Sequence, residues 1–270
     1  MENVKIAIIG GTGVYRLPGF KEIQQVLVET EFGSIPVKIG IWSGKKIAFI
    51  TRHGEKHSIA PGCINYRANI KALSMLGVKQ IYSTACVGSV NPDYKPGTFV
   101  VLRQFLDFTK NRKSSFFLFD GTQEGEVISH VDMTDPYCDR LSKVFIEAGE
   151  MAGIDVKDGA TYCCMEGPRY ETRAEVKMLR MLGGDVAGHT SFPEQVLARE
   201  AEICYASIGI VSSMAAGIEE GHVNAGVVEA AMEKMFDNVQ QILMNAIELT
   251  DVDEDCWCKH SLDGTVHQKS

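Results

Sequence analysis

Six apolar, β-rich runs recur along the chain, and each of them ends in a glycine-rich or polar loop. Segments of helical periodicity separate several of these runs, so strands and helices are expected to alternate. Runs that are apolar at nearly every position are typical of strands buried on both faces, as in a largely parallel sheet under helices. The six runs are residues 4–13, 46–54, 79–89, 161–171, 185–194 and 204–217, and the helical segments are 65–76, 172–182, 192–203 and 225–249.

The length of the chain fits one large domain. A chain of 270 residues can bury a full core, and the alternating pattern predicts a single α/β domain with a mixed, mostly parallel sheet flanked by helices. We expect this domain to span residues 1–250. The stretch from Asn91 to Gly125 adds a further strand and a loop. From Asp251 onward the pattern gives way to a polar tail, 251–270, which we expect to be mobile.

The composition excludes several functional classes. The net charge of −8 argues against a surface that coats nucleic acid, because such a surface needs a basic excess. The N-terminus runs directly into a strand pattern without the features of a signal peptide, and no apolar run is long enough to cross a bilayer. We therefore expect a soluble, cytoplasmic protein that binds neither nucleic acid nor membrane.

The strand ends are the expected place for a ligand, because open α/β sheets bind ligands outside the carboxyl ends of their strands. The loops at these ends carry a cation, hydroxyl groups, small residues, an aromatic ring and a carboxylate. That combination fits a small anion together with a flat ring system. The residues concerned are Thr12, Arg52, His53, Ala85, Cys86, Tyr170, Glu171, His189, Thr190 and Ser213.

Tyr170 and Glu171 indicate the kind of ring. They follow the Gly167-Pro168 break after the fourth apolar run and precede a helical segment. An aromatic ring can stack on a heterocycle, and an ionised carboxylate, which only accepts hydrogen bonds, can read an N–H on its edge. Glu171 is therefore the residue that we expect to select the substrate.

Arg52 and His53 are the leading candidates for binding an anion. An arginine fork can form bidentate, charge-assisted hydrogen bonds to phosphate, although an ordinary ion pair is the alternative for any arginine. The glycine loop at 10–13, with the Thr12 hydroxyl, can offer N–H groups to an oxyanion. A dinucleotide site is disfavoured there, because Arg16 takes the place of the third glycine and Pro18 follows.

The eight cysteines predict buried free thiols, as is usual in an intracellular protein. Cys256 and Cys258 form a close pair, but no other cysteine has zinc-finger spacing to them, so no metal site is expected. Cys86 fits a small residue that packs a tight loop better than a nucleophile. Motifs of serine hydrolases and zinc proteases do not occur.

Six motifs in one register, over about residues 4–249, resemble the trimeric purine nucleoside phosphorylases and specifically their methylthioadenosine phosphorylase branch. They are GGTGV, TRHGEKH, NYRANIKAL, EGPRYETRAE, HTSFPEQVLARE and ICYASI. The resemblance implies phosphorolysis of a nucleoside to a free purine and a sugar 1-phosphate. It also implies a homotrimer, with inorganic phosphate as co-substrate and neither metal nor organic cofactor.

The resemblance also implies roles for individual residues. Arg52, His53 and Ser213 would be catalytic, and Tyr170 would stack on the base. His189 stands where the family usually has a methionine under the ribose. The phosphate-binding positions are Thr12, Arg52, His53, Ala85, Cys86 and Thr190, and those along the base edge are Ser213, Met214 and Ala215.

Departures from the methylthioadenosine branch bear on the choice of purine. That branch typically has two aspartates aligned with Ser213 and Ala215, and a small residue in place of Glu171. A carboxylate accepts from N1–H of hypoxanthine or guanine, whereas adenine offers a lone pair at N1. Since mismatched buried polar groups can discriminate by about 10⁴–10⁵-fold, we expect inosine or guanosine to be preferred over adenosine.

Two points remain open at this level. Ala225 stands near the position where phosphorylases of low molecular weight place a histidine for the 5′-hydroxyl, so methylthioinosine or methylthioadenosine stays an alternative substrate. Cys138 and Cys204 align with positions that form a disulfide in heat-adapted archaeal relatives, which also carry a C-x-C, whereas relatives from moderate temperatures can keep the first pair as thiols. The rivals from other classes are a purine-binding sensor and an NAD-type oxidoreductase.

Overall fold

The computed structural model of this chain describes residues 3–117 and 127–268. A mixed sheet dominates it, with strands in the order β10-β6-β8-β9-β5-β1-β4-β3-β2. The strands are β1 (Ile6–Gly10), β2 (Lys21–Thr30), β3 (Gly33–Trp42), β4 (Lys45–Thr51), β5 (Gln80–Ser89), β6 (Phe99–Phe108), β8 (Val156–Met165), β9 (Val186–Gly188) and β10 (Cys204–Met214). Two short strands, β7 (Val127–Ser129) and β11 (Val266–Gln268), form a separate antiparallel ladder.

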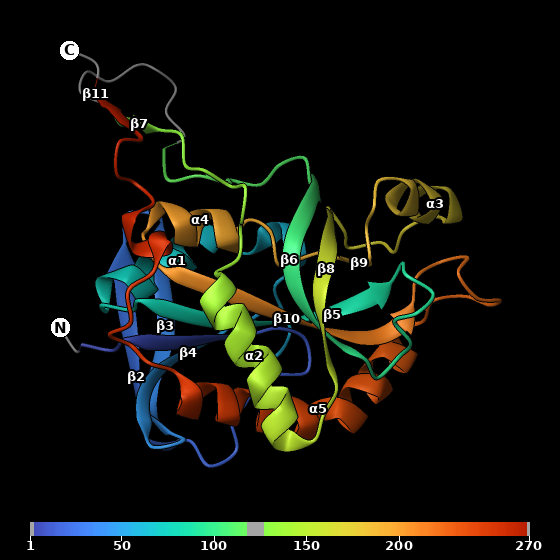
Figure 1. Ribbon diagram of the computed structural model, residues 1–270, viewed down its shortest axis with the longest axis horizontal. Coiled ribbons are helices and arrows are strands. Elements are labelled where there is room, and N and C mark those ends of the chain that lie inside the picture. Colours follow the sequence, from blue (N-terminus) through green and yellow to red (C-terminus); the bar gives the residue numbers. More distant parts are fainter. Residues whose placement is uncertain (1–2, 118–126, 269–270) are drawn as a thin grey trace.

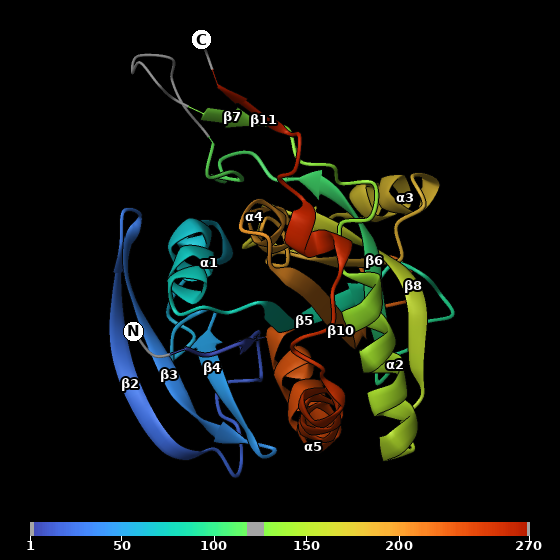
Figure 2. The same cartoon turned by 60° about the vertical axis from the view of Figure 1, so that its left-hand side comes forward.

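Half of this sheet closes on itself. β10 pairs in parallel with β5 and antiparallel with β6, so β5, β10, β6, β8 and β9 form a ring. The parallel pair β1–β4 and the antiparallel strands β3 and β2 extend from the other edge of β5. Figure 2 shows the extension on one side of the molecule and the strands of the ring on the other.

Helices cover both faces of the sheet. α1 (Tyr66–Met75) and α4 (Glu194–Glu200) bury Leu73 and Leu197 in one core, and α2 (Asp139–Ala152) and α5 (Ala225–Leu249) bury Phe145 and Ile242 in a second. Figures 1 and 2 show these two pairs on opposite sides of the strands. α3 (Arg173–Met181) lies over a smaller third cluster. The predicted fold class, a single α/β domain with a mixed sheet flanked by helices, is confirmed.

Each of the six apolar runs contains a strand, and each of the four helical segments contains a helix. Pattern reasoning did not identify the hairpin of β2 and β3 or helix α2. β2 is exposed at most positions, so it lacks the continuous apolar signal of a buried strand. The predicted loop that ends at Gly125 falls partly outside the described residues.

The C-terminal segment packs against the domain, which corrects the expectation of a mobile tail. It includes a 3₁₀ turn at Trp257–His260, and both Cys258 and Ser261 are buried. The Ser261 hydroxyl donates to the Arg199 carbonyl over 2.6 Å. The Gln80 side chain donates to the Asp251 carbonyl, also over 2.6 Å. Apolar and hydrogen-bonding contacts thus hold a segment whose composition alone suggested disorder.

Within residues 3–117 and 127–268, no helix combines the length and the apolar character needed to cross a membrane.

Candidate functional site

One cavity of about 340 Å³ opens where the loops after β1, β4, β8 and β9 meet β5, β10 and the start of α5. This volume lies at the lower end of the range for small-molecule sites. Most of the predicted site residues surround it: Thr12, His53, Cys86, Tyr170, Glu171, His189, Thr190, Ser213, Met214, Ala215 and Ala225. Arg52 and Ala85 are the two predicted residues that do not line it.

The glycine loop forms the tight end of the cavity. The Gly11 N–H donates to the Thr84 hydroxyl over 2.9 Å. A Cβ atom at Gly11 would lie 2.4 Å from the Thr84 carbonyl oxygen and 2.8 Å from Nη1 of Arg52. No side chain fits between these atoms, so glycine is required where the loop approaches β5.

Arg52 lies behind this loop and is almost fully buried. Its Nε and Nη2 donate to the two carboxylate oxygens of Glu194 over 2.5 and 2.8 Å, and Nη2 also donates to the Ser83 hydroxyl over 2.6 Å. Although burial opposes its charge, the Glu194 carboxylate raises the pKa of this guanidinium. The fork that we predicted to bind phosphate is therefore engaged by Glu194, which corrects the expectation of a direct bidentate contact.

Ala85 lies behind the cavity wall, and its role at a phosphate-binding position stays a prediction. Its side chain is fully buried within β5, and the residue faces Gly209 of β10 in register. The next three residues, Cys86, Val87 and Gly88, are the ones that line the cavity. The methyl group of Ala85 thus packs the sheet rather than facing a ligand.

His53 lies in the cavity wall as a neutral ring. Its Nδ1 lies 2.9 Å from the Ile59 carbonyl, which can only accept, so Nδ1 carries the proton. Burial, reinforced by the neighbouring Arg52, His57 and His189, lowers the pKa of His53 to about 4. At neutral pH Nε2 is therefore an acceptor.

His57 extends this histidine pair. The rings of His53 and His57 lie 4.4 Å apart between centroids, and the hydroxyl of Tyr15 lies 2.7 Å from Nδ1 of His57. His57 lines the cavity as well, although the sequence pattern marked it only as the end of the TRHGEKH motif. It borders a second cavity too, together with Tyr15 and Glu229.

Glu171 and His189 form a pair in the cavity wall. His189 Nε2 lies 3.1 Å from Glu171 Oε1, and the two side chains are 17% and 8% exposed. An ionised Glu171 accepts from this nitrogen and keeps its second oxygen for another donor. The Tyr170 ring lies 6.4 Å from the His189 ring between centroids. His189 therefore orients the predicted specificity residue, a role that the sequence did not indicate.

The segment after Glu171 is fixed by its own contacts. Thr172 caps α3 by accepting from the Glu175 N–H over 3.1 Å, and the Glu175 carboxylate accepts from the Thr172 N–H over 2.7 Å. Arg169 forms a bidentate pair with Glu175 at 2.7 and 2.8 Å. The polar residues around Tyr170 and Glu171 thus hold the loop, and Arg169 is committed to Glu175.

The end of β10 carries a bulge. The register with β5 shifts between Val211 and Ser213, and both Ser212 and Ser213 line the cavity. Strict strand alternation would turn only one of two neighbouring residues inward, and bulges are a common way to re-aim a side chain. The Ser212 hydroxyl donates to the Val87 carbonyl over 3.2 Å. Ser213 forms no hydrogen bond through its side chain within the described residues.

The start of α5 closes the cavity with an apolar wall. Val223, Ala225 and Val228 line it, together with the carboxylate residue Glu229. The Asn224 side chain caps the helix by accepting from the Gly226 N–H over 2.8 Å. His222, three residues before Ala225, is not among the lining residues.

Arg112 holds two walls together and was missed in the sequence. Its Nη1 donates to the Phe192 carbonyl over 2.6 Å, and its Nη2 donates to the His189 carbonyl over 2.5 Å. The guanidinium also lies over the Tyr66 ring at 5.4 Å. An arginine in a polar loop gives no sequence signal for such contacts to backbone carbonyls.

Comparisons with known proteins match this chain over nearly its whole length. A family model described as "Phosphorylase superfamily" matches residues 5–248. A probable 6-oxopurine nucleoside phosphorylase of Thermococcus kodakarensis is 47% identical over 97% of this chain and 98% of the relative. The 6-oxopurine nucleoside phosphorylase of Pyrococcus furiosus is 43% identical over 97% and 99%. An S-methyl-5′-thioadenosine phosphorylase of Thermofilum pendens is 40% identical over 97% and 98%.

Solved structures give the same picture. A methylthioadenosine phosphorylase from an Antarctic soil metagenomic library superposes with a TM-score of 0.90 at 35% identity, over 99% of this chain and 93% of that one. The methylthioadenosine phosphorylase of Schistosoma mansoni, in complex with adenine, superposes with a TM-score of 0.87 at 31% identity, over 97% and 99%.

Proposed function

Because this chain belongs to the phosphorylase superfamily, among the purine nucleoside and methylthioadenosine phosphorylases, we propose that it cleaves purine nucleosides with inorganic phosphate and prefers inosine and guanosine. The products are the free 6-oxopurine and ribose 1-phosphate. The family predicted from the sequence is thereby confirmed.

The placement of Glu171 is the observation that carries the choice of purine. Its carboxylate is nearly buried in the cavity wall, with one oxygen held by His189. The second oxygen can accept from N1–H of a 6-oxopurine. Adenine would instead place the lone pair of its N1 against this charge. The buried carboxylate oxygen would then have no hydrogen-bond donor, which weakens binding. Tyr170, at the rim of the same wall, stacks on the base.

Phosphate binds at the opposite end, near the glycine loop. Thr12 and Thr190 line the same cavity as His53, and the unprotonated Nε2 of His53 accepts from a protonated phosphate oxygen. Arg52 acts on phosphate indirectly, through the glycine loop. Its guanidinium lies next to Gly11 and is paired with Glu194. This pair fixes the loop and leaves the bound phosphate to be held mainly by N–H groups and hydroxyls.

The reaction follows from this arrangement. Phosphate approaches the anomeric carbon from the side opposite the base, the glycosidic bond breaks, and the negative phosphate stabilises the oxocarbenium-like sugar. The leaving purine takes the bonding electrons. The unpaired Ser213 hydroxyl at the bulge donates a hydrogen bond to the base as charge develops there. No covalent intermediate with the enzyme is needed.

A second substrate class is supported by the wall at the start of α5. Val223, Ala225 and Val228 offer an apolar surface to a 5′-substituent, and a 5′-methylthio group would lie there without losing hydrogen bonds. Combined with Glu171, this wall supports 5′-methylthioinosine as the alternative substrate. Glu229, in the same wall, can accept from a 5′-hydroxyl and so supports inosine and guanosine.

A panel of nucleosides tests the proposal. Inosine, guanosine, adenosine, methylthioadenosine and methylthioinosine are each incubated with and without phosphate, and release of the base is measured. We expect phosphate-dependent release with inosine or guanosine turned over fastest. Binding of these nucleosides without phosphate-dependent release would support a sensor and overturn the proposal.

We also propose that the enzyme assembles as a homotrimer. Ile59 and Tyr170 are 38% and 41% exposed, although both are apolar or aromatic and belong to loops that contribute residues to the cavity. A neighbouring subunit would cover such side chains. Sedimentation equilibrium at several concentrations should give a mass three times that of the chain, and a monomer at concentrations where the enzyme is active would contradict this.

A further inference from the structure

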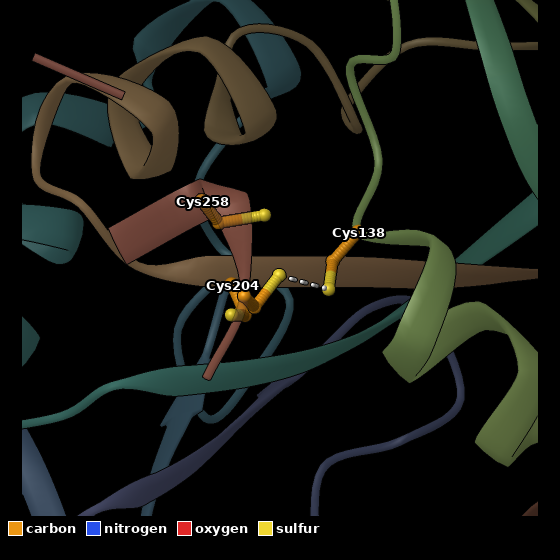
Figure 3. A group of neighbouring side chains, drawn as sticks. Cys138, Cys204 and Cys258 are labelled. Atoms are coloured by element: carbon orange, nitrogen blue, oxygen red, sulfur yellow. Dashed lines mark hydrogen bonds between the residues drawn. The ribbon is translucent and has the colours of Figure 1, made fainter. Parts of the chain in front are cut away.

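Four cysteines from three separate parts of the chain meet outside the cavity. Cys138 precedes α2, Cys204 begins β10, and Cys256 and Cys258 flank Trp257 in the C-terminal segment. Their four sulfur atoms all lie within 4.8 Å of one another, and the Cys138 and Cys256 sulfurs are 3.5 Å apart. Figure 3 shows Cys138, Cys204 and Cys258 gathered where these three segments join.

We propose that these four cysteines bind one zinc ion as a structural Cys₄ site. Zinc binds thiolates at about 2.3 Å, so the sulfurs of a tetrahedral site are about 3.8 Å apart. The observed sulfurs all lie within 4.8 Å of one another, so no separation exceeds that of a tetrahedral site by more than about 1 Å. Four sulfur ligands in a tetrahedral set favour zinc over calcium or magnesium, which prefer oxygen.

The surrounding charge supports thiolates at this place. The Arg199 Nη1 lies 3.6 Å from the Cys258 sulfur, and the Arg140 Nη2 lies 3.9 Å from the Cys204 sulfur. A zinc ion with four thiolates carries a net charge of −2. Arg199 and Arg140 offset part of this charge, although Arg140 Nη1 also lies 3.4 Å from Glu254 Oε2. N–H donors to the ligand sulfurs are the contacts that commonly orient and tune a metal site.

Arg199 is the stronger evidence for thiolates, because this charged residue is only 2% exposed. Within the described residues no carboxylate forms an ion pair with it; its Nη2 donates to the Asp135 carbonyl and its guanidinium lies 4.3 Å from the Trp257 ring. Neutral thiols or disulfides would leave this buried cation with only the exposed Asp132 carboxylate as a nearby negative charge, which is costly. Zinc-bound thiolates add negative charge in direct contact with it.

The burial of the ligands assigns the site to structure rather than catalysis. Cys138, Cys204 and Cys258 are buried and Cys256 is partly exposed. With all four positions filled by protein, no ligand position is open to water or substrate. The ion would join the C-terminal segment to α2 and β10. The sequence predicted no metal site because its ligands are widely spaced. Cys138 lies more than a hundred residues before the C-x-C pair, and Cys204 lies about fifty residues before it.

Metal analysis tests this proposal directly. The full chain is purified with a reductant and without chelators, supplied with zinc, freed of excess ions and analysed by elemental mass spectrometry. We expect one zinc per chain, lost in Cys258→Ser. The exposed Cys63 lies outside the cluster, so Cys63→Ser is the matched control and should keep its zinc. A zinc content in the unaltered protein no higher than in Cys258→Ser would overturn the proposal.

Two further measurements keep the test decisive if Cys258→Ser does not fold. Cobalt added to the metal-free protein should give the visible bands of a tetrahedral thiolate site, and Arg199→Met should lower zinc affinity by about 10–100-fold.

Intact mass under non-reducing conditions tests whether these cysteines form disulfides instead. A loss of two or four hydrogens that maps to these cysteines in the protein as it accumulates in cells would show disulfides and overturn the zinc site.

Discussion

The Glu171–His189 pair shows how far a single side chain depends on its neighbour. The sequence predicts Glu171 as the residue that binds the purine edge, whereas the resemblance places His189 under the ribose and does not link it to Glu171. In the structure the two side chains lie 3.1 Å apart. The histidine ring cannot be interpreted without its partner, and the partner lies 18 residues away along the chain.

His53 should make the protein sensitive to acid. Its pKa is lowered to about 4, so between pH 6.5 and 4 the unfolded chain binds a proton that the folded protein does not. Folding stability is unaffected by this group above pH 6.5 and falls as the pH drops through this window, by about 3 kcal/mol in total. Denaturant unfolding at several pH values measures this loss.

The variant His53→Gln should lose less stability than the unaltered protein over the same pH window. His222→Gln, at an exposed histidine, serves as the control and should follow the unaltered protein. Identical acid dependence for His53→Gln and the unaltered protein would contradict a buried, neutral His53.

At the scale of elements, the strand ends determine which residues meet. Patterns located the strands that carry the site, and the rule that ligands bind at strand ends brought most of the site residues together. The bulge in β10 was not predictable in this way, because it turns both Ser212 and Ser213 toward the cavity. Arg52 was also misjudged, since the sequence gives no sign that Glu194, 142 residues away, engages its fork.

The glycine loop after β1 should not tolerate a side chain. Gly11→Ala places a methyl group 2.4 Å from the Thr84 carbonyl oxygen, and overpacking of this kind typically costs about 1–3 kcal/mol. The loop must shift, so KM for phosphate should rise as well. Gly226→Ala, where the nearest atom is the end of the Asn224 side chain at 3.3 Å, is the control. Unchanged stability and KM in Gly11→Ala would show that the loop is not tightly packed.

The cap of α3 should position the loop that carries Glu171. Thr172→Ala removes the acceptor for the Glu175 N–H and should lower the free energy of unfolding by about 0.5–2 kcal/mol. Because Glu171 is the preceding residue, KM for inosine should rise. Lys177→Ala, at an exposed position of the same helix, should change neither quantity. An unchanged KM in Thr172→Ala would mean that the cap does not position Glu171.

At the scale of the whole molecule, the C-terminal segment is the part that composition described least well. Residues 251–270 lack helical or strand periodicity, so their polar character suggested a mobile tail. The structure instead buries Cys258 and Ser261 against α2, α4 and β10, through contacts that span more than sixty residues of sequence. Such contacts follow from the fold of the rest of the chain and leave no local pattern.

Removing this segment should therefore destabilise the whole enzyme. Truncation after Thr250 exposes the apolar surface that Cys258 and its neighbours cover, and should lower the free energy of unfolding by more than about 2 kcal/mol. Thermal or denaturant unfolding measures the loss. Truncation after Thr265 keeps Cys258 and Ser261 and should cost less. Equal stability of the truncation after Thr250 and the full chain would mean that the segment contributes nothing to the fold.

The most direct test of the account is the substrate preference of Glu171→Gln. The ratio of kcat/KM for inosine to kcat/KM for adenosine is measured at saturating phosphate in the unaltered enzyme, in this variant and in Glu166→Gln, a matched change at a carboxylate outside the cavity lining. An amide can donate to N1 of adenine as well as accept from N1–H, so we expect Glu171→Gln to lower the ratio by about 10²-fold or more and Glu166→Gln to preserve it. A ratio that stays unchanged in Glu171→Gln, or an unaltered enzyme that consumes adenosine faster than inosine, would contradict the account.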